Sequence, residues 1–208
     1  MAEYKLHCFA QSGNAYKVAL ALELAGADWE PIWVDFFKGG ARSPEFTDKN
    51  IMAEVPVLEH DGKVMSQSGV ILAYLTETLG KYEPSDPREA LRWILWDNHK
   101  LTANMATWRF LTNFAPEKMR SPDVIGFLGQ RAQGALKVLD SHLYERDWIV
   151  GDALSTADLS CIGYMYYTDE YPIDWASYPN VTAWRDRIKA QRGWKHPYDL
   201  MPGHPLPA

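Results

Sequence analysis

Residues 53–75, AEVPVLEHDGKVMSQSGVILAYL, decide how this chain is expected to fold. Asp61-Gly62 is a strong signal for a two-residue turn, and the runs on either side of it predict a pair of short strands. Apolar residues then recur at helical spacing, and Ser68 stands where a helix would open. The stretch therefore predicts a β-hairpin followed directly by an amphipathic helix.

Val55 and Pro56 stand immediately before this hairpin. A proline at the entry to a strand removes no ladder hydrogen bond, and a tight bend there tolerates a cis peptide bond. With a cis bond, the Val55 amide and carbonyl would point outward beside the amide-rich start of the Ser68 helix. That arrangement suits an extended, anionic, peptide-like ligand. The plainer alternative is that Pro56 only begins a strand and Ser68 only caps a helix.

The flanking sequence predicts the rest of a first domain. We expect a strand over residues 4–9, a helix over 16–25, a strand over 28–35 with Pro31 at a sheet edge, and an irregular segment over 36–50. This order, completed by the hairpin and its helix, is that of a thioredoxin-like domain, which we assign to residues 1–80. Ligands on such sheets gather where strands end and helices begin. Residues 81–87 contain Pro84 and Pro87 and break every periodicity, which predicts a linker.

The remaining residues, 88–208, show helical spacing and no hairpin signal, so we expect an all-helical second domain. Within it, Ser155 and Asp158 have the spacing of a capping box, and leucines on both sides form a hydrophobic staple. We interpret this box as structural. The proline-rich tail after Trp194 is expected to be irregular.

Composition and charge exclude several classes of function. A net charge of −6 without a basic run argues against a nucleic-acid surface. No apolar run approaches the roughly 20 residues that cross a bilayer. Cys8 and Cys161 lie far apart without metal-ligand spacing, which predicts buried thiols in a reducing cytoplasm. We therefore expect a cytoplasmic protein that binds no nucleic acid, membrane or metal.

The order Val-Pro, hairpin, Gln-Ser and amphipathic helix resembles the glutathione-binding half of the cytosolic glutathione transferase family, in its bacterial, serine-type, theta- or zeta-like form. The resemblance implies that family's fold, an α+β thioredoxin-like domain followed by an all-α domain. It also implies that Val55, before a cis Pro56, pairs with the cysteinyl backbone of glutathione. Gln67 and Ser68 would hold the γ-glutamyl end. Lys38 would meet the glycine carboxylate, the alternative being a solvated loop lysine.

Ser12 lies between the first strand and the first helix, at the place of the activating serine in serine-type transferases. An unperturbed thiol has a pKa near 8.5, so a hydroxyl donor and the positive end of a helix would favour the thiolate of bound glutathione. Asn14 is the reserve candidate, since its amide can donate to sulfur, and either residue could be only an N-cap. The zeta-class Ser-Ser-Cys run is Ser-Gly-Asn here, which puts zeta-type isomerisation of maleylacetoacetate in doubt.

The resemblance places a second substrate between the two domains, with Phe9, Met105, Trp108 and Arg109 as the candidates for its pocket. Met105 and Trp108 can equally be helical core. The implied protein is a homodimeric detoxification enzyme, a glutathione S-transferase, with glutathione as co-substrate and no metal. Its glutathione thiolate would attack a small apolar electrophile. The alternatives are glutathione-dependent isomerisation or ether cleavage, and non-catalytic binding of glutathione or a hydrophobe.

Overall fold

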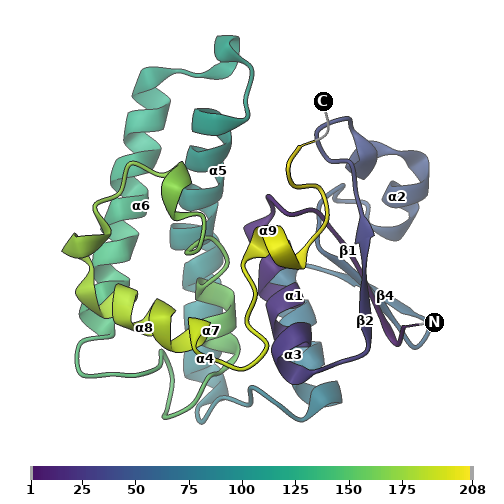
Figure 1. The fold of residues 1–208 in the computed structure, drawn as a ribbon, viewed down its shortest axis with the longest axis horizontal. Helices are drawn as coiled ribbons and strands as arrows, with labels where there is room; N and C mark the ends of the chain where they lie inside the picture. The colour runs from purple at the N-terminus through teal and green to yellow at the C-terminus, as the bar shows by residue number, and fades with distance from the viewer. Residues whose placement is uncertain (1, 207–208) are drawn as a thin grey trace. The chain divides into compact units, whose positions relative to one another are not determined.

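A computed structural model describes residues 2–206 of the chain (Figure 1). The predicted domains also include residues 1, 207 and 208, which lie outside the described residues. Two compact units are present, one made of residues 2–83 together with 191–206 and the other of residues 84–190. The boundary at residue 83 falls within the predicted linker. Residues 191–206, which the sequence places in the helical domain, pack in the first unit instead.

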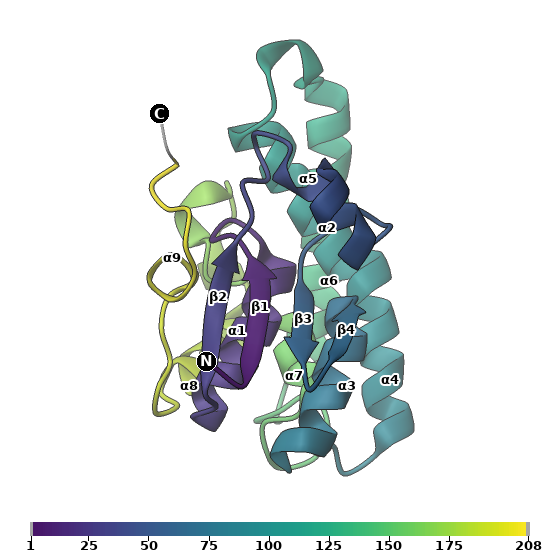
Figure 2. The same cartoon turned by 90° about the vertical axis from the view of Figure 1, so that its right-hand side faces the viewer.

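The first unit is built on a four-stranded sheet with the order β2-β1-β3-β4. Its strands are β1 (Tyr4–Cys8), β2 (Trp29–Trp33), β3 (Val57–His60) and β4 (Lys63–Ser66). β1 pairs with β2 in parallel and with β3 in antiparallel, and the β3–β4 hairpin completes the sheet, as Figure 2 shows. The predicted hairpin is confirmed. Pro31 lies on edge strand β2, as predicted, where a missing N–H costs no ladder bond.

Helices cover both faces of this sheet. α1 (Gly13–Ala25) and α3 (Ser68–Leu79) lie on one face, and α2 (Pro44–Lys49) lies on the other (Figure 1). α1 begins before residue 16, the predicted start, because Ser12 caps its first turn. It ends at Gly26, whose φ of 69° is the left-handed conformation expected directly after a helix.

The second unit is helical throughout, as predicted. Its helices are α4 (Pro87–Trp96), α5 (Thr102–Asn113), α6 (Pro122–His142), α7 (Thr156–Cys161) and α8 (Pro179–Lys189). A π-helical turn, η2 (Asp97–Leu101), joins α4 to α5, and single 3-10 turns occur at η3 (Glu117–Met119), η4 (Thr168–Glu170) and η5 (Trp175–Ser177). None of the helices in the described part of the chain is both long and apolar enough to cross a membrane.

The predicted capping box at the start of α7 is confirmed. Asp158 accepts hydrogen bonds from the Ser155 amide at 3.0 Å and from the Ser155 hydroxyl at 2.9 Å. Its other oxygen accepts from the Ile149 amide and from the Trp184 indole nitrogen, both at 2.9 Å. Because Asp158 is fully buried, this one carboxylate joins the loop before α7, α7 itself and α8.

The tail contains regular structure that the sequence did not predict. Pro197–Leu200 form a single helical turn, α9, and the backbone after it runs beside the loop that precedes α1. The Ala10 amide donates to the Pro202 carbonyl at 2.7 Å, and the Gln11 side chain donates to the Gly203 carbonyl at 2.8 Å. These hydrogen bonds hold the tail in the first unit and explain why it belongs there.

Candidate functional site

Strand pairing brings the predicted glutathione-binding segments together along one edge of the sheet, the edge at which β1, β2 and β4 end and β3 begins. His7 pairs with Val57, and Val57 pairs with Ser66, so the end of β1, the start of β3 and the end of β4 lie side by side (Figure 2). Cys8 pairs with Trp33, which brings the end of β2 to the same edge. The segments that leave this edge carry Ser12, Lys38, Val55 and Gln67.

Val55 and Pro56 are joined by a cis peptide bond, as predicted. β3 begins after them, at Val57, so Val55 lies outside the ladder. Among the described residues, none makes a hydrogen bond to the Val55 amide or carbonyl. A peptide-like ligand that lies along this segment therefore finds a donor and an acceptor at a single residue.

Gln67 and Ser68 form the start of α3. Gln67 has φ 69° and ψ 111°, a conformation that residues with a Cβ rarely adopt, and its Nε2 donates to the Met52 sulfur at 3.0 Å. Such strain persists where the surroundings enforce it, and it concentrates at binding sites. Ser68 is 4% exposed, and within the described chain its hydroxyl has no hydrogen-bond partner. The start of α3 thus presents free amides and a free hydroxyl.

Ser12 serves as the N-cap of α1, so one of the alternatives raised by the sequence is present. Its Oγ accepts from the Ala15 amide at 3.2 Å, and the residue is 5% exposed. Accepting a hydrogen bond uses a lone pair of the hydroxyl and leaves its proton free to be donated. The cap geometry therefore orients the hydroxyl at the helix start without consuming its donor.

Asn14 lies in the first turn of α1, and its Oδ1 is buried without a hydrogen-bond partner. Few buried polar atoms in native proteins lack a partner, and those that do call for an explanation. A ligand at the start of α1 that donates a hydrogen bond to Oδ1 would supply one. The structure thus supports keeping Asn14 beside Ser12 as a candidate.

Lys38 lies on the exposed loop after β2. Its amide donates to the Asp35 carboxylate at 3.2 Å, which shapes the turn. Gly39 follows with φ 87°, and the Gly40 amide donates to the Asp35 carbonyl at 2.7 Å. The tight loop presents Lys38 at the site edge, and its role toward a ligand stays a prediction.

Substitution of Gly40 by alanine should destabilise this loop. A Cβ at Gly40 would lie 2.9 Å from the Asp35 carbonyl oxygen and 3.0 Å from the Asp35 nitrogen, both backbone atoms, so the loop has to shift. We expect a loss of about 1–3 kcal/mol in the free energy of unfolding, measured by urea denaturation. Gly126→Ala in α6 is the control, since its Cβ meets nothing within 4 Å. That helical substitution should instead stabilise by about 0.4–1 kcal/mol. Equal effects of the two variants would contradict the close-approach argument.

Phe9, a predicted pocket residue, belongs to an aromatic cluster at the same edge. Its ring stacks on Phe36 with centroids 4.8 Å apart and meets Phe37 edge-on at 5.9 Å. Phe9 is 7% exposed, whereas Phe37 is 38% exposed. Phe36 and Phe37 were not predicted as site residues, although two adjacent phenylalanines close after a strand were the available signal.

The other predicted pocket residues lie on α5. Met105 and Trp108 are buried, and the Trp108 ring lies 5.3 Å from the ring of Tyr171. Arg109 is 2% exposed, and its Nε donates to the Glu170 carboxylate at 2.9 Å. The burial of Met105 and Trp108 fits the core interpretation that the sequence left open for these two residues. The pocket assignment of the three residues stays a prediction.

The chain's own thiols are poorly placed for chemistry. Cys8 and Cys161 are buried and form no disulfide, as predicted. Burial raises the pKa of the Cys8 thiol to about 12, so it remains protonated at neutral pH and is a poor nucleophile. A thiolate at this site therefore has to come from a ligand.

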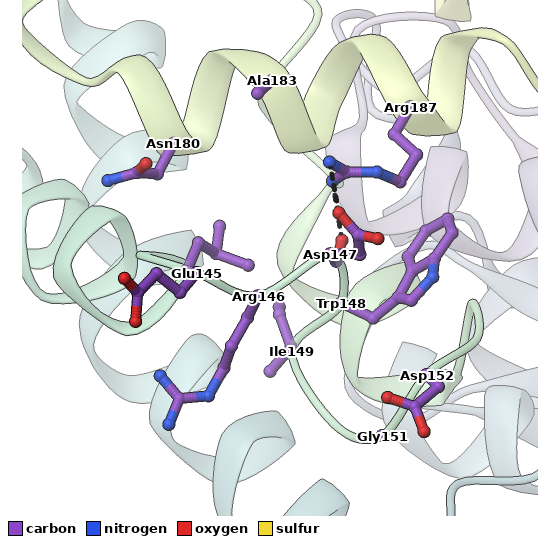
Figure 3. A pocket seen from close by; sticks show the side chains of 11 residues that line it. Glu145, Arg146, Asp147, Trp148, Ile149, Gly151, Asp152, Asn180, Ala183 and Arg187 are labelled. Carbon is purple, nitrogen blue, oxygen red and sulfur yellow. Dashed lines mark hydrogen bonds and ion pairs between the residues drawn. The ribbon is translucent and has the colours of Figure 1, made fainter.

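The helical unit has a hollow of about 710 Å³ between the loop that follows α6 and one side of α8 (Figure 3). Its wall is largely polar, and Arg187 in it is paired with Asp147 at 2.7 Å. No predicted site residue lines this hollow. The sheet edge remains the candidate site.

Comparison with known proteins finds matches along most of the chain. The family model "Glutathione S-transferase, N-terminal domain" matches residues 2–77, and "Glutathione S-transferase, C-terminal domain" matches residues 129–192. The chain is 31% identical over 193 residues to the disulfide-bond oxidoreductase YfcG of Escherichia coli, covering 88% of this chain and 89% of that protein. It is 29% identical over 192 residues to maleylacetoacetate isomerase of Dictyostelium discoideum, covering 85% and 84% of the two chains.

Solved structures show the same fold. A possible glutathione S-transferase from Rhodopseudomonas palustris superimposes with a TM-score of 0.86 at 31% identity, covering 96% of this chain and 91% of that chain. Ure2p in complex with glutathione superimposes with a TM-score of 0.83 at 22% identity, covering 92% and 96%, and supports the fold alone. The thioredoxin-like domain followed by an all-helical domain is therefore the glutathione S-transferase fold, and this chain belongs to the glutathione S-transferase family.

Proposed function

We propose that the protein is a glutathione-dependent enzyme that binds reduced glutathione at the sheet edge and activates its thiol for attack on a small apolar electrophile. The observation that carries this proposal is the unpaired backbone of Val55 at the same edge as the open start of α3. Family membership supports it independently.

The proposed binding mode uses one feature for each part of the tripeptide. The Val55 amide and carbonyl pair with the cysteinyl backbone, next to Pro56. The γ-glutamyl carboxylate lies at the start of α3, where the helix dipole, the free amides and the Ser68 hydroxyl favour an anion. Gln67 lies beside it. Lys38 meets the glycine carboxylate.

In the proposed mechanism, the start of α1 stabilises the glutathione thiolate. Lowering a thiol pKa by two units takes about 2.7 kcal/mol, which a charge-assisted hydrogen bond and a helix terminus together can supply. The thiol proton is lost to solvent, the Ser12 hydroxyl donates a hydrogen bond to the resulting thiolate sulfur, and the Asn14 amide nitrogen is a further donor. The thiolate then forms a carbon–sulfur bond to the electrophile, whose leaving group departs with the bonding electron pair.

A second candidate function is glutathione-dependent disulfide exchange. The relative named disulfide-bond oxidoreductase favours it. Because Cys8 and Cys161 are both buried, the attacking thiolate in such a reaction would be that of glutathione. The glutathione thiolate would attack one sulfur of a substrate disulfide, form a mixed disulfide and release the other sulfur as a thiolate. The thiolate of a second glutathione would then attack the glutathione sulfur of the mixed disulfide, which forms glutathione disulfide and releases the remaining substrate sulfur as a thiolate. Isomerisation and ether cleavage would use the same thiolate.

We also propose a homodimer, in which the α3 start lies near the partner. Ile51 is 90% exposed and Met52 56%, and Val64 and Val70 are also exposed. Exposed apolar side chains that gather on one surface are typical of protein interaction sites, and these four residues lie before β3, on β4 and on α3. The proposed second-substrate pocket comprises Phe9, Met105, Trp108 and Arg109. A cytoplasmic location and a detoxification role complete the proposal.

Calorimetric titration with reduced glutathione tests the binding mode. The wild type should release heat on association, and Ser68→Ala should weaken the affinity about tenfold or more, because a hydrogen bond to a charged group is lost. Ser121→Ala is the control, since Ser121 is a serine at the start of a helix, α6, that makes no side-chain cap bond. No heat of association in the wild type would contradict the proposal. If Ser68→Ala binds glutathione with the same affinity as the wild type, Ser68 does not contribute to glutathione binding.

A further inference from the structure

Arg185 in α8 is a charged side chain with buried donors that have no partner. Its Nε and Nη1 are both inaccessible to solvent and make no hydrogen bond. The indole Nε1 of Trp175, on the 3-10 turn η5, is also buried and unpaired. The guanidinium carbon lies 4.5 Å from the centre of the Trp175 ring, so these donors belong to a single cluster.

The described residues supply no acceptor for this cluster. No carboxylate among them pairs with Arg185, and its other ring neighbour, Tyr166, lies 5.9 Å from the guanidinium carbon. The Tyr166 hydroxyl donates to the Arg185 carbonyl at 2.8 Å and so faces the helix backbone. Burial lowers the pKa of Arg185, while Tyr166 and Asp186 oppose this, and an arginine stays charged at neutral pH. Buried cationic donors without an acceptor are costly, and folded proteins rarely keep them without a use.

We propose that Arg185 and Trp175 form a binding site for the carboxylate of a small apolar acid, within the helical unit. The end of a guanidinium offers two parallel N–H groups, one from Nη1 and one from Nη2, and a carboxylate matches them with its two oxygens. One of these oxygens also accepts from the indole N–H. The aromatic rings of Trp175 and Tyr166 beside the guanidinium favour an acid whose body is apolar. This site differs from the glutathione site in residues and in structural unit.

Trp175 is the side chain through which we expect access. Its indole makes no side-chain hydrogen bond, and it lies on a single turn that Asp174 holds through the Ala176 amide at 3.2 Å. The Thr182 hydroxyl anchors the Trp175 carbonyl at 3.2 Å, so the backbone is fixed to α8. Rotation of the indole about its own side-chain bonds exposes the guanidinium without unfolding the turn.

Titration of the full chain with sodium benzoate tests this site. The indole N–H resonance of Trp175 is identified as the signal missing from the Trp175→Phe spectrum. In the wild type it should shift progressively as it gains an acceptor. Benzoate should also raise the melting temperature, because it binds the folded state only. Arg185→Leu should lower the benzoate affinity at least about tenfold, and Arg185→Lys should restore it only partly, because lysine lacks the fork.

Arg192→Leu is the control for loss of a positive charge, since Arg192 is exposed, and it should bind benzoate like the wild type. Sodium phosphate at equal ionic strength is the comparison ligand, and it should not shift the indole N–H resonance of Trp175. The proposal is overturned if benzoate does not move that signal, or if the shift persists unchanged in Arg185→Leu. An equal response to phosphate overturns the carboxylate assignment. If Arg185→Leu does not fold, the benzoate affinity of Trp175→Phe tests the proposal instead. That affinity should be lower than the affinity of the wild type, because the indole donor is lost.

Discussion

Replacement of Ser12 by alanine should raise the pKa of the glutathione thiol in the complex and slow the reaction at neutral pH by about 10–100-fold. The hydroxyl of Ser12 is buried at the start of α1, and its cap bond to Ala15 leaves the proton free to donate. Without it, the sulfur keeps only the helix terminus and the Asn14 amide. The measurement is the ultraviolet absorbance of the thiolate, followed against pH with bound glutathione.

The same substitution also removes a helix cap, so stability needs a control. Loss of the Ser12 cap should cost about 1 kcal/mol. Asp86→Ala removes a comparable cap, because Asp86 accepts from the Arg88 and Glu89 amides at the start of α4. Both variants should therefore lose stability, but only Ser12→Ala should change the thiolate titration. If Ser12→Ala behaves like Asp86→Ala in both respects, Ser12 is a cap alone.

Asn14→Ala separates the two donor candidates. Because the buried, unpaired atom of Asn14 is Oδ1, an acceptor that cannot donate to a thiolate, we expect this variant to shift the thiol pKa less than Ser12→Ala does. A larger shift in Asn14→Ala would reverse the two roles while leaving glutathione binding intact. Unchanged thiol pKa values in both variants would contradict activation at the start of α1.

The fold of the first unit was predictable because its signals are local. Two adjacent residues, Asp61 and Gly62, predict the turn, and a two-residue turn then determines how β3 and β4 pair. The gathering of Ser12, Val55 and Gln67 at one edge was predictable only through the resemblance to a family. No periodicity in the sequence states that the ends of β1 and β4 lie on either side of β3.

The unpredicted features depend on contacts between residues far apart in the sequence. The tail shows no periodic apolar pattern, so the sequence could not predict that it contacts Ala10 and Gln11. The close approach of Gly203 to the Trp33 indole was unpredictable for the same reason. The unpaired donors of Arg185 and Trp175 are equally non-local. Buried partners and missing partners are properties of packing, which spacing rules do not describe.

Substitution of Asp158 by alanine should cause the largest loss of stability, about 3–5 kcal/mol in the free energy of unfolding. The sequence indicates only the local capping box with Ser155. In the structure the carboxylate also accepts from the Ile149 amide and the Trp184 indole, so its removal leaves buried donors unpaired in segments far apart in the chain. The cost therefore exceeds the ~1 kcal/mol expected for an isolated cap.

Urea denaturation of Asp158→Ala, Asp158→Asn and Ser155→Ala measures these contributions. Asp158→Asn should fall between the other two, because its amide keeps an oxygen for some of the donors but turns an N–H₂ group toward the rest. Asp152→Ala is the matched control, an exposed aspartate in the preceding turn, and should change stability by less than about 0.5 kcal/mol. A loss in Asp158→Ala no larger than that in Ser155→Ala would show that the Ile149 and Trp184 bonds contribute nothing. The carboxylate would then act as a local cap rather than as the junction of the loop, α7 and α8.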